Sequence, residues 1–391
     1  MKANSKFLLL ICITLFCVGC KNNYSNHTSK GEVADSSFIS NFSQPLNVKF
    51  AQGFGVDNYK DYKRVSILDI QTKDTIATYF FLPKGITTPD AIKDTTKIIR
   101  VPIERVAIMS TTYLGAFNLF DATSLIVAAT DCSLINNSKA IERVKNGSIT
   151  DLGSSMEPNA ELITAANPDI LLLSDMTKDS EKIFFGNTKV RQVIENDWKE
   201  TTLLGRAEWL KMVALLTGEV TKGNEIFDRI CNRYNEVKQR VGNKANMPSI
   251  LFGTDYRGQW YLPGKDSYVT HMIEDASGSF DTPVQGNISQ PMAFEAILNR
   301  YKSADKWLSL GVLGVKTLKD LQQNNPRYAL FDAFKNGEVY MADKKLNANG
   351  GNDFFESGVY APDVVLKDLV SILYPNIFPN YKTVYWRRLP K

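Results

Sequence analysis

The sequence predicts an α/β fold in which two blocks of alternating strands and helices flank one long helix. Three observations lead to this prediction. Short, uninterrupted apolar segments typical of buried parallel strands alternate with amphipathic segments on both sides of the middle of the chain. The central stretch 203–242 carries apolar residues at three- and four-residue intervals. The chain has 391 residues, of which 43% are hydrophobic and 23% charged, which is enough for two cores.

The first nineteen residues are expected to form a signal sequence. Lys2 and Lys6 supply a charged head, and residues 7–18 form an apolar run too short to span a bilayer. The sequence CVGC at 17–20, followed by a polar stretch, resembles the lipobox of bacterial lipoproteins, although a cysteine stands where leucine is usual. The resemblance implies that Cys20 becomes the lipidated first residue. A plain secretory signal with a chance cysteine is the alternative.

The next two segments precede the first block. Residues 20–45 are rich in serine and asparagine and lack apolar periodicity, so we expect a flexible tether there. Residues 46–101 contain β-type runs at 63–68 and 78–82, separated by polar turns. We expect a β-rich extension with a hairpin on the edge of the sheet that follows.

The first block, residues 102–202, alternates strands and helices. We expect strands at 105–109, 125–129 and 170–173, and helices at 111–120 and 157–166. Strands this apolar indicate a parallel sheet that is covered on both faces. Ligand-binding loops then belong at the carboxyl ends of the strands.

The middle segment, residues 203–242, separates the two blocks. Gly218 ends a short helix, and a second helix from Glu219 to Val241 would be about 35 Å long. This helix suits a strut between two lobes or an ordinary packed helix of one large domain, and periodicity does not separate the two. In the second block, residues 243–391, we expect strands at 249–252, 307–310 and 339–342 and helices at 268–276, 293–300 and 363–373.

Composition excludes several classes of function. The net charge of +4 falls to +2 when Lys2 and Lys6 leave with the leader, and no basic patch indicates nucleic acid. His271 is the sole histidine after the tether, so we expect no metal site for a free transition metal and no cofactor. Cys132 and Cys231 remain in the folded part. Cys231 lies on the apolar stripe and is expected to be a small buried residue, and a disulfide between the two stays open.

The usual catalytic motifs are also missing from the sequence. It has no G-x-S-x-G elbow, no phosphate-binding Walker loop and no His-Glu-x-x-His pair. We therefore assign no catalytic residue and expect a protein that is not an enzyme. A hydrolase that uses carboxylates alone stays open as an alternative.

Several motifs occur in the order found in one family. They are DLGSSMEPNAELITAANPDILLL (151–173), LLGRAEW (203–209), PSILFG (248–253), SQPMAFEAIL (289–298) and ADKW (304–307). Together they resemble the solute-binding lipoproteins of ABC importers for ferric siderophores, cobalamin and haem, over residues 102–375. The segment GGNDFFESG (350–358) resembles the larger members. The resemblance implies two Rossmann-like lobes joined by a single long rigid helix, with the ligand cleft between the lobes.

The resemblance also implies a docking site. Glu161 and Glu295 lie early in their expected helices, at motif positions where the family places glutamates that meet arginines of the permease. Two carboxylates at a fixed separation would orient the protein on a permease dimer, which works with its ATPase. Alternatively, each carboxylate only stabilises the N-terminus of its own helix.

Candidate ligand contacts come from four loops and one strand. Ser110, Thr111 and Tyr113 follow an expected strand and open a helix, where hydroxyls and free amides suit a polar ligand edge, but helix capping is the alternative. The aromatic side chains of the 256–261 loop suit a planar macrocycle or a catecholate, with an arginine for charge. Tyr256, Arg257, Trp260 and Tyr261 are the candidates in this loop and Trp307 is the candidate in a strand, with core packing as the alternative for both. Asn352, Phe354 and Phe355 are candidates in the 350–356 stretch, which could instead be a loop folded against the second lobe. Met156 could line the cleft or cover the sheet.

We therefore expect a lipid-anchored protein on the cell membrane, facing the periplasm or the cell exterior. It would capture a small molecule and deliver it to an ABC permease. A ferric siderophore is the first choice of ligand, cobalamin the second and haem the third. From other classes, a surface hydrolase and an adaptor that only contacts the permease stay open.

Overall fold

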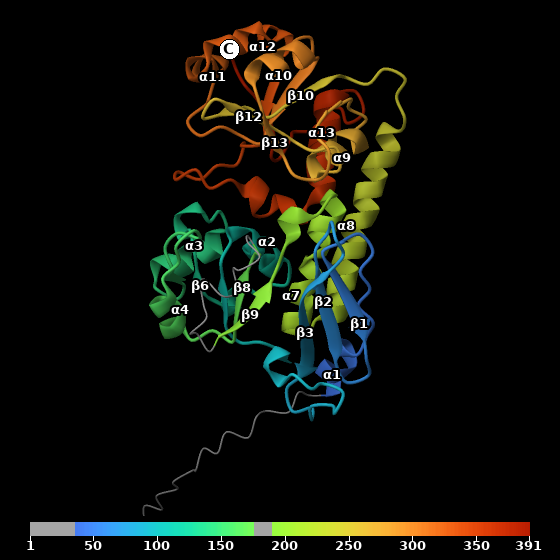
Figure 1. Cartoon of the computed structure of the whole chain (residues 1–391), viewed down its shortest axis with the longest axis vertical. Helices are drawn as coiled ribbons and strands as arrows, with labels where there is room; N and C mark the ends of the chain where they lie inside the picture. The colour runs from blue at the N-terminus through green and yellow to red at the C-terminus, as the bar shows by residue number, and fades with distance from the viewer. Residues whose placement is uncertain (1–35, 176–189) are drawn as a thin grey trace, which may run out of the picture. The chain divides into compact units, whose positions relative to one another are not determined.

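Two largely parallel sheets organise the described part of the chain, residues 36–175 and 190–391 of a computed structural model (Figure 1). The predicted signal sequence 1–19 and the predicted lipidation site Cys20 lie outside the described residues. Among the helices of the described segments, none is both long enough and apolar enough to cross a membrane.

The first sheet has five described strands, all parallel, in the order β7-β6-β5-β8-β9. They are β5 (Val106–Ile108), β6 (Ile126–Ala129), β7 (Thr150–Asp151), β8 (Ile170–Leu173) and β9 (Arg191–Ile194). Every residue of β5, β6 and β8 is buried, so both faces of the sheet are covered, as the apolar runs predicted. The helices of this region are α2 (Thr111–Leu119), α3 (Ser138–Lys145) and α4 (Ala160–Ala166).

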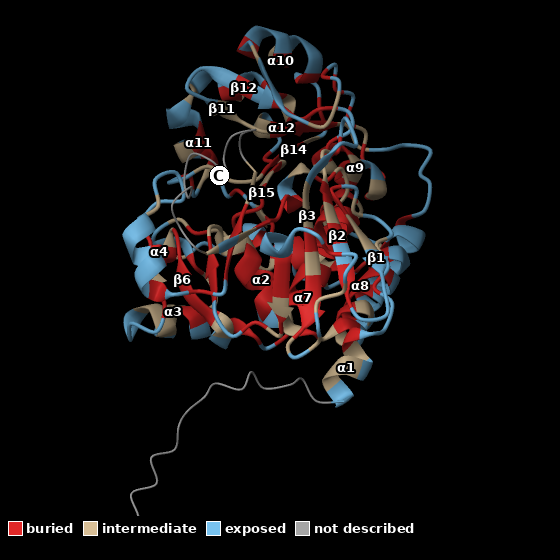
Figure 2. Ribbon diagram, turned by 60° about the horizontal axis from the view of Figure 1, so that its bottom comes forward, coloured by how far each residue is buried: buried red, intermediate tan, exposed pale blue. Residues whose placement is uncertain are grey.

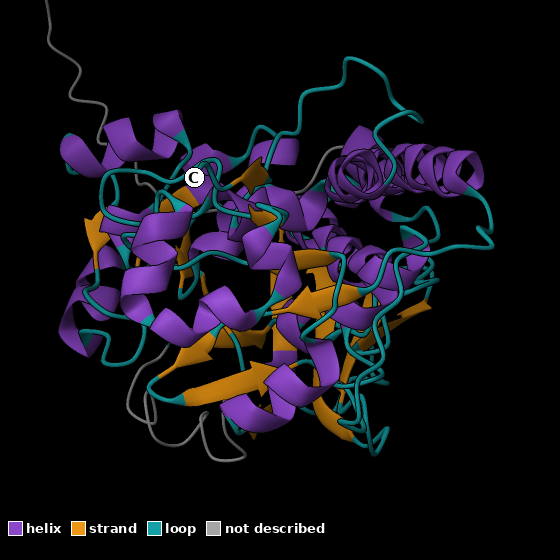
Figure 3. Ribbon diagram, turned by 90° about the horizontal axis from the view of Figure 1, so that it is seen from above, coloured by secondary structure: helices purple, strands orange, loops and turns teal. Residues whose placement is uncertain are grey.

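The second sheet joins three parallel strands and an antiparallel edge strand, in the order β10-β14-β15-β16. They are β10 (Ile250–Phe252), β14 (Lys306–Ser309), β15 (Val339–Met341) and β16 (Arg387–Arg388). The helices here are α9 (Tyr268–Asp275), α10 (Phe294–Tyr301), α11 (Leu318–Asn324), α12 (Asp332–Lys335) and α13 (Pro362–Leu373). The mixed α/β fold with parallel sheets is thus confirmed, and helices surround the strands (Figure 3).

A small antiparallel sheet beside β10 was not predicted. It contains β11 (Asp255–Tyr256), β12 (Gln259–Leu262) and β13 (Gln290–Met292), in that order. Its strands are two to four residues long. Such short strands give too little alternation to be recognised in a sequence.

The predicted long helix is α8, which runs from Val220 to Val241 over 22 residues. It follows α6 (Leu203–Glu208) and α7 (Leu210–Thr217) and packs against both α7 and α13. The predicted apolar stripe is buried along α8: Ile226, Phe227, Ile230, Cys231, Tyr234, Val237 and Val241. Val220 and Gly223 of the same helix are buried as well. Gly218 ends α7 at φ 76°, where a Cβ would lie 2.0 Å from the Phe38 ring, so the turn requires glycine.

The N-terminal extension forms a four-stranded sheet of its own, in the order β1-β2-β3-β4. Its strands are β1 (Phe54–Asn58), β2 (Lys63–Leu68), β3 (Thr75–Pro83) and β4 (Ile98–Val101). The β2–β3 hairpin is confirmed, but it does not extend the edge of the first parallel sheet, because β4 pairs with β3 in parallel and closes a separate sheet.

The stretch expected to be a flexible tether differs from the expectation near its end. Helix α1 spans Ser36–Phe42, and the Phe42 side chain is 2% exposed. The Phe38 and Phe42 rings stack 6.2 Å apart, one helical turn from each other. The serine-rich composition hid this short apolar face. Figure 2 shows many buried residues in α2, α7 and several strands, whereas β11 and β12 lie among exposed residues.

Candidate functional site

Two adjacent cavities lie at the carboxyl ends of strands from both parallel sheets. The larger has a volume of about 540 Å³ and the smaller about 290 Å³, and Leu310 and Gly311 line both. The segment after β9 contributes Trp198 and Lys199 to the larger cavity, and the segment after β10 contributes Gly253 and Thr254. In open α/β sheets this edge is where ligands bind, so the position itself indicates a binding site.

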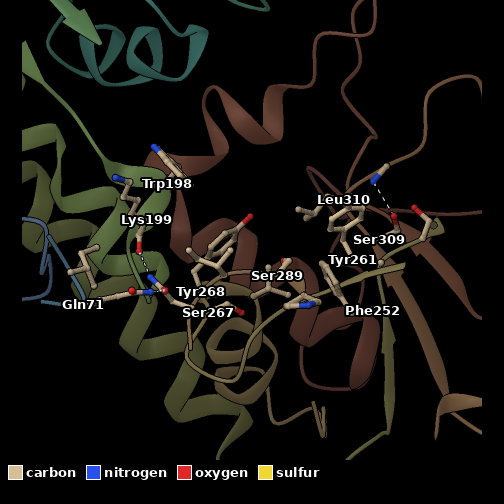
Figure 4. A pocket seen from close by; sticks show the side chains of 18 of the residues that line it. Gln71, Trp198, Lys199, Phe252, Tyr261, Ser267, Tyr268, Ser289, Ser309 and Leu310 are labelled. Atoms are coloured by element: carbon tan, nitrogen blue, oxygen red, sulfur yellow. Dashed lines mark hydrogen bonds between the residues drawn. The ribbon is translucent and has the colours of Figure 1, made fainter. Parts of the chain in front are cut away.

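Aromatic and aliphatic side chains form much of the larger cavity's wall (Figure 4). Trp198 is 43% exposed and Tyr261 47% exposed, and the half-buried Tyr268 and the buried Phe252 complete the aromatic set. The aliphatic members are Ile70, Pro263, Val269, Ile288 and Leu310. Exposed aromatic rings in a concave site are a large apolar surface for a ligand.

Few charged groups face the larger cavity, and each has a partner in the protein. The ammonium of Lys199 lies 3.3 Å from the Asp175 carboxylate and 5.3 Å from the Trp198 ring centroid. The Asp69 carboxylate accepts hydrogen bonds from the backbone N–H groups of Thr72 and Gln71, and these bonds lower its pKa. The cavity is also lined by residues with uncharged polar side chains: Gln71, Thr254, Ser267, Asn287, Ser289 and Ser309.

A buried ion pair contacts the segments that carry two aromatic residues of the larger cavity. Arg206 Nη2 lies 2.7 Å from the Asp197 carboxylate, and the two side chains are 7% and 4% exposed. The Arg206 guanidinium also lies 4.6 Å from the centroid of the Tyr268 ring. Asp197 is in the short 3-10 segment that carries Trp198, so the pair fixes Trp198 and Tyr268 in the same framework.

A second buried carboxyl lies beside this pair. The Tyr360 hydroxyl donates to Glu195 Oε1 at 3.3 Å, and the Tyr113 hydroxyl donates to the Glu195 carbonyl oxygen at 3.1 Å. Burial raises the pKa of the Glu195 carboxyl well above its ordinary value, and the nearby Asp197 adds to the rise. Tyr113 is 1% exposed, so it is a core residue here and not the predicted ligand wall.

The smaller cavity includes three predicted residues, Thr111, Asn352 and Phe355. Phe355 is 37% exposed, whereas the Asn352 amide is engaged in its own loop: Nδ2 donates to the Ala342 carbonyl at 2.8 Å and Oδ1 accepts from Phe354 N–H. Leu313, at 80% exposure, projects from the same rim. Thr111 and Phe355 are therefore the predicted residues best placed to touch a ligand there.

Three further aromatic predictions are corrected by burial. Trp260 is 1%, Trp307 0% and Phe354 2% exposed. The indole N–H groups of Trp260 and Trp307 donate to the carbonyls of Phe252 and Gly253, at 2.8 and 2.7 Å. The centroids of the two indole rings lie 5.7 Å apart in an aromatic core cluster. Their N–H groups and ring faces therefore contact other parts of the protein and are not available to a ligand.

Four other predicted residues line neither cavity; Tyr256, Arg257 and Met156 are exposed, whereas Ser110 is half-buried. Tyr256 (62% exposed) and Arg257 form the tip of the β11–β12 hairpin, where Arg257 and Gly258 have φ of 53° and 80°. Two successive positive φ angles are typical of a tight two-residue hairpin turn. Met156 is 69% exposed in the loop after β7, and the Ser110 side chain caps α2 by accepting from Thr112 N–H.

The two predicted docking residues are exposed. Glu161 lies in the first turn of α4, and Glu295 lies in the first turn of α10. Glu295 Oε1 accepts from Arg327 Nη1 at 2.8 Å. Both carboxylates are accessible to a partner, and docking stays a prediction.

Sequence reasoning missed several members of the larger cavity, including Gln71, Trp198, Lys199, Tyr268 and Ile288. Trp198 follows β9, a strand whose sequence RQVI is too polar to be recognised. The one feature of the sequence that could have indicated Trp198 as a site residue is its position as a lone tryptophan in the polar stretch NDWKE. Gln71 comes from a polar turn in the extension, for which the sequence offers no signal.

The described segments contain no group of three or more His, Cys, Asp or Glu side chains that could hold a metal ion. Cys132 and Cys231 are free and buried, and burial raises the pKa of their thiols to about 12 and about 11. His271 Nδ1 lies 2.7 Å from the Thr201 carbonyl oxygen.

Comparison with known proteins shows where this architecture recurs. The family model described as periplasmic binding protein matches residues 106–346. An uncharacterized lipoprotein of Methanocaldococcus jannaschii is 26% identical over 390 residues, covering 95% of each chain. An iron-uptake system-binding protein of Bacillus subtilis is 27% identical over 280 residues, covering 66% of this chain and 80% of its own.

A solved structure shares the fold. The triscatecholate siderophore binding protein FeuA of Bacillus subtilis, complexed with ferri-bacillibactin, matches with a TM-score of 0.55 at 20% identity, covering 71% of this chain and 94% of its own. The family model covers more than half of the chain, and the site lies at the strand edge where such folds bind ligands. The chain belongs to the family of periplasmic binding proteins.

Proposed function

We propose that this protein is the solute-binding lipoprotein of an ABC importer and that it captures a ferric siderophore or a related iron complex. The observation that carries the proposal is the larger cavity, which gathers loops from the carboxyl ends of both parallel sheets. Its volume of about 540 Å³ is in the range of small-molecule sites. Relatives named for iron uptake and for triscatecholate siderophore binding support the choice of ligand.

The chemistry of the wall favours a ligand with flat, apolar surfaces. Trp198, Tyr261 and Tyr268 offer aromatic faces, and the charged lining groups Asp69 and Lys199 are paired within the protein. Catecholate rings would stack on these faces, and the lysine and the serine hydroxyls would meet the polar rim of the chelate. This differs from the expected arginine-based recognition, because Arg257 does not line the cavity.

Cobalamin is the alternative ligand, because the same aromatic wall suits a corrin macrocycle. Haem is third, because no histidine of the described residues lines either cavity and the Tyr261 phenol is the accessible group that would ligate its iron. A carboxylate-based hydrolase finds less support. Asp69 is the only carboxylate among the described residues that line the larger cavity, and its oxygen is held by backbone N–H groups in a turn.

The mechanical part of the proposal concerns α8. We infer that the two sheets with their helices are Rossmann-like lobes and that α8 is a rigid strut between them. An unbroken helix of 22 residues that packs against both α7 and α13 supports this inference. Such a strut permits little closure, so affinity would come from a largely preformed cavity.

Delivery requires a membrane anchor and a docking surface. We infer that Cys20 carries the lipid and that Glu161 and Glu295 meet basic residues of a permease dimer driven by its ATPase. Both carboxylates are exposed in the first turns of α4 and α10, which supports the docking role. The protein would then work outside the cytoplasm, attached to the membrane.

Calorimetric titration tests the ligand assignment. The purified chain is titrated with a ferric triscatecholate, a ferric trishydroxamate, ferric citrate, cobalamin and haem. We expect saturable binding of one ferric chelate with a submicromolar Kd and recovery of the ligand unchanged. Saturable binding of cobalamin or haem alone would replace the siderophore, and conversion of a bound compound would favour an enzyme.

A further inference from the structure

The N-terminal extension reaches the larger cavity, although it lies before the matched family region 106–346. Asp69, Ile70 and Gln71, in the turn between β2 and β3, line that cavity. Gln71 Nε2 donates to Asn287 Oδ1 at 3.0 Å, and Asn287 Nδ2 donates to the Lys199 carbonyl at 3.0 Å (Figure 4). A short chain of hydrogen bonds thus joins three walls of the cavity.

The turn that carries Gln71 is held in one conformation. Asp69 Oδ1 accepts from the N–H groups of Gln71 and Thr72, both at 2.9 Å, and the Asp69 carbonyl accepts from Lys73 N–H at 2.9 Å. Lys73 has φ 62°, and its ammonium donates to Gln52 Oε1 at 2.9 Å. Gln71 is therefore presented by a preorganised loop, which lowers the entropic cost of using its side chain in recognition.

Buried carboxylates anchor the extension to the rest of the protein. Glu208 accepts hydrogen bonds from three consecutive N–H groups, those of residues 49–51, at 2.6 to 3.0 Å. Glu200 accepts from the next two, Gln52 and Gly53, at 2.9 to 3.0 Å. Glu208 is 0% and Glu200 2% exposed, so releasing the extension would remove these hydrogen bonds from two buried carboxylates, which is costly. The extension is a fixed part of the cavity wall.

We propose that the extension is a third component of the solute site and that Gln71 is a specificity-determining residue. This inference rests on the proposed function. Bonded to Asn287, Gln71 closes one side of the cavity and limits the size of solute that enters. Its amide also presents a polar edge to the solute.

Truncating Gln71 has a defined physical consequence. Gln71→Ala removes the bond to Asn287 Oδ1 and opens the wall beside it. We expect the Kd of the preferred solute to rise about three- to tenfold, the range of one hydrogen bond. Bulkier solutes of the same class should bind relatively better, because the wall no longer excludes them. Asn287→Ala should act alike, and the double variant should lose little more than either single variant, because both remove the same interaction.

The experiment uses the full chain in detergent and calorimetric titration with the ferric triscatecholate, ferric citrate, cobalamin and haem. Lys73→Asn is the matched control: it lies in the same turn, tolerates the positive φ and does not line the cavity. We expect Gln71→Ala to change the ratio of affinities between solutes by about tenfold, or about 1.4 kcal/mol. Lys73→Asn should change it by less than about twofold, because the hydrogen bonds to Asp69 that hold the turn remain.

Two results would overturn the inference. In the first, the wild type binds a probe and Gln71→Ala binds every probe within twofold of it, which removes the role of Gln71 and leaves the proposed function intact. In the second, Lys73→Asn shifts the affinities as much as Gln71→Ala, which shows that turn stability matters and the Gln71 side chain does not. A wild type that binds none of the probes rejects the proposed function itself, and this inference with it.

Discussion

Trp260 and Tyr261 are neighbours on β12, yet Trp260 is 1% exposed in the aromatic core and Tyr261 is 47% exposed in the larger cavity. The strand alternation sends the two side chains to opposite faces. Recognition and stability should therefore be separable at these two positions.

Tyr261→Ala should weaken solute binding about tenfold and change the free energy of unfolding by about 1 kcal/mol or less, because the side chain is half exposed. Trp260→Ala should instead cost about 3–5 kcal/mol of stability through the cavity it leaves. Urea unfolding and calorimetric titration of each variant measure the two effects. Equal loss of affinity in folded Trp260→Ala and Tyr261→Ala would show that the division is wrong.

The Glu356 carboxylate accepts hydrogen bonds from Asn136 N–H at 2.7 Å and Asn137 N–H at 2.8 Å, and so joins the loop before α13 to the loop before α3. Burial raises the pKa of Glu356 to about 7 from 4.5, against the lowering effect of these bonds. Between these two pH values the folded protein holds a proton that the unfolded chain has lost. Stability from this group is therefore greatest at low pH and is lost as the pH rises from 4.5 through 7.

We expect the free energy of unfolding of the wild type to fall, relative to Glu356→Gln, by up to about 3 kcal/mol between pH 4.5 and pH 8. The glutamine cannot ionise, so its profile reports the other buried carboxyls, and subtraction isolates Glu356. Urea unfolding at several pH values measures the difference. Parallel profiles for the two proteins would contradict the assigned pKa.

The buried pair of Arg206 and Asp197 gives a third prediction. Arg206→Met leaves the Asp197 carboxylate buried without its partner and should cost about 3–5 kcal/mol of stability. Adding Asp197→Asn should recover a substantial part. Arg64→Met is the matched control, because Arg64 and Asp57 pair at the surface with 45% and 51% exposure and should contribute less than about 1 kcal/mol. Equal costs in the two single variants would show that burial does not set the energy of the pair.

The docking proposal predicts a defect in transport alone. Reversing charge with Glu161→Arg and Glu295→Arg should abolish uptake in cells and leave the Kd for the solute within twofold of the wild type, because neither residue lines a described cavity. Glu157→Arg is a control for charge, since this exposed glutamate precedes α4. Normal uptake by the double variant would remove the docking role.

The sequence was informative where hydrophobic pattern alone decides structure. The buried strands β5, β6 and β8 and the apolar stripe of α8 were predicted within one or two residues, because uninterrupted apolar runs and helical periodicity follow from burial. The cavity could be placed at the strand ends for the same reason.

The individual site residues were harder to predict. An aromatic residue in a loop after a strand can face the core, as Trp260 does, or the cavity, as Tyr261 does, and a one-residue shift in strand register reverses the two. Gln71 and Trp198 come from segments that reach the cavity through tertiary packing. No local pattern in the sequence records such packing.

The most direct test of the account measures the Kd of one solute for four proteins: the wild type, Trp198→Ala, Tyr261→Ala and Tyr256→Ala. Trp198 and Tyr261 line the larger cavity, whereas Tyr256 is equally aromatic and more exposed but lies at a hairpin tip outside it. The account predicts that Trp198→Ala and Tyr261→Ala each raise the Kd about tenfold or more, in the range of an aromatic contact, and that Tyr256→Ala stays within twofold. Loss of binding in Tyr256→Ala, with normal binding in the other two variants, would place the solute elsewhere and contradict the account.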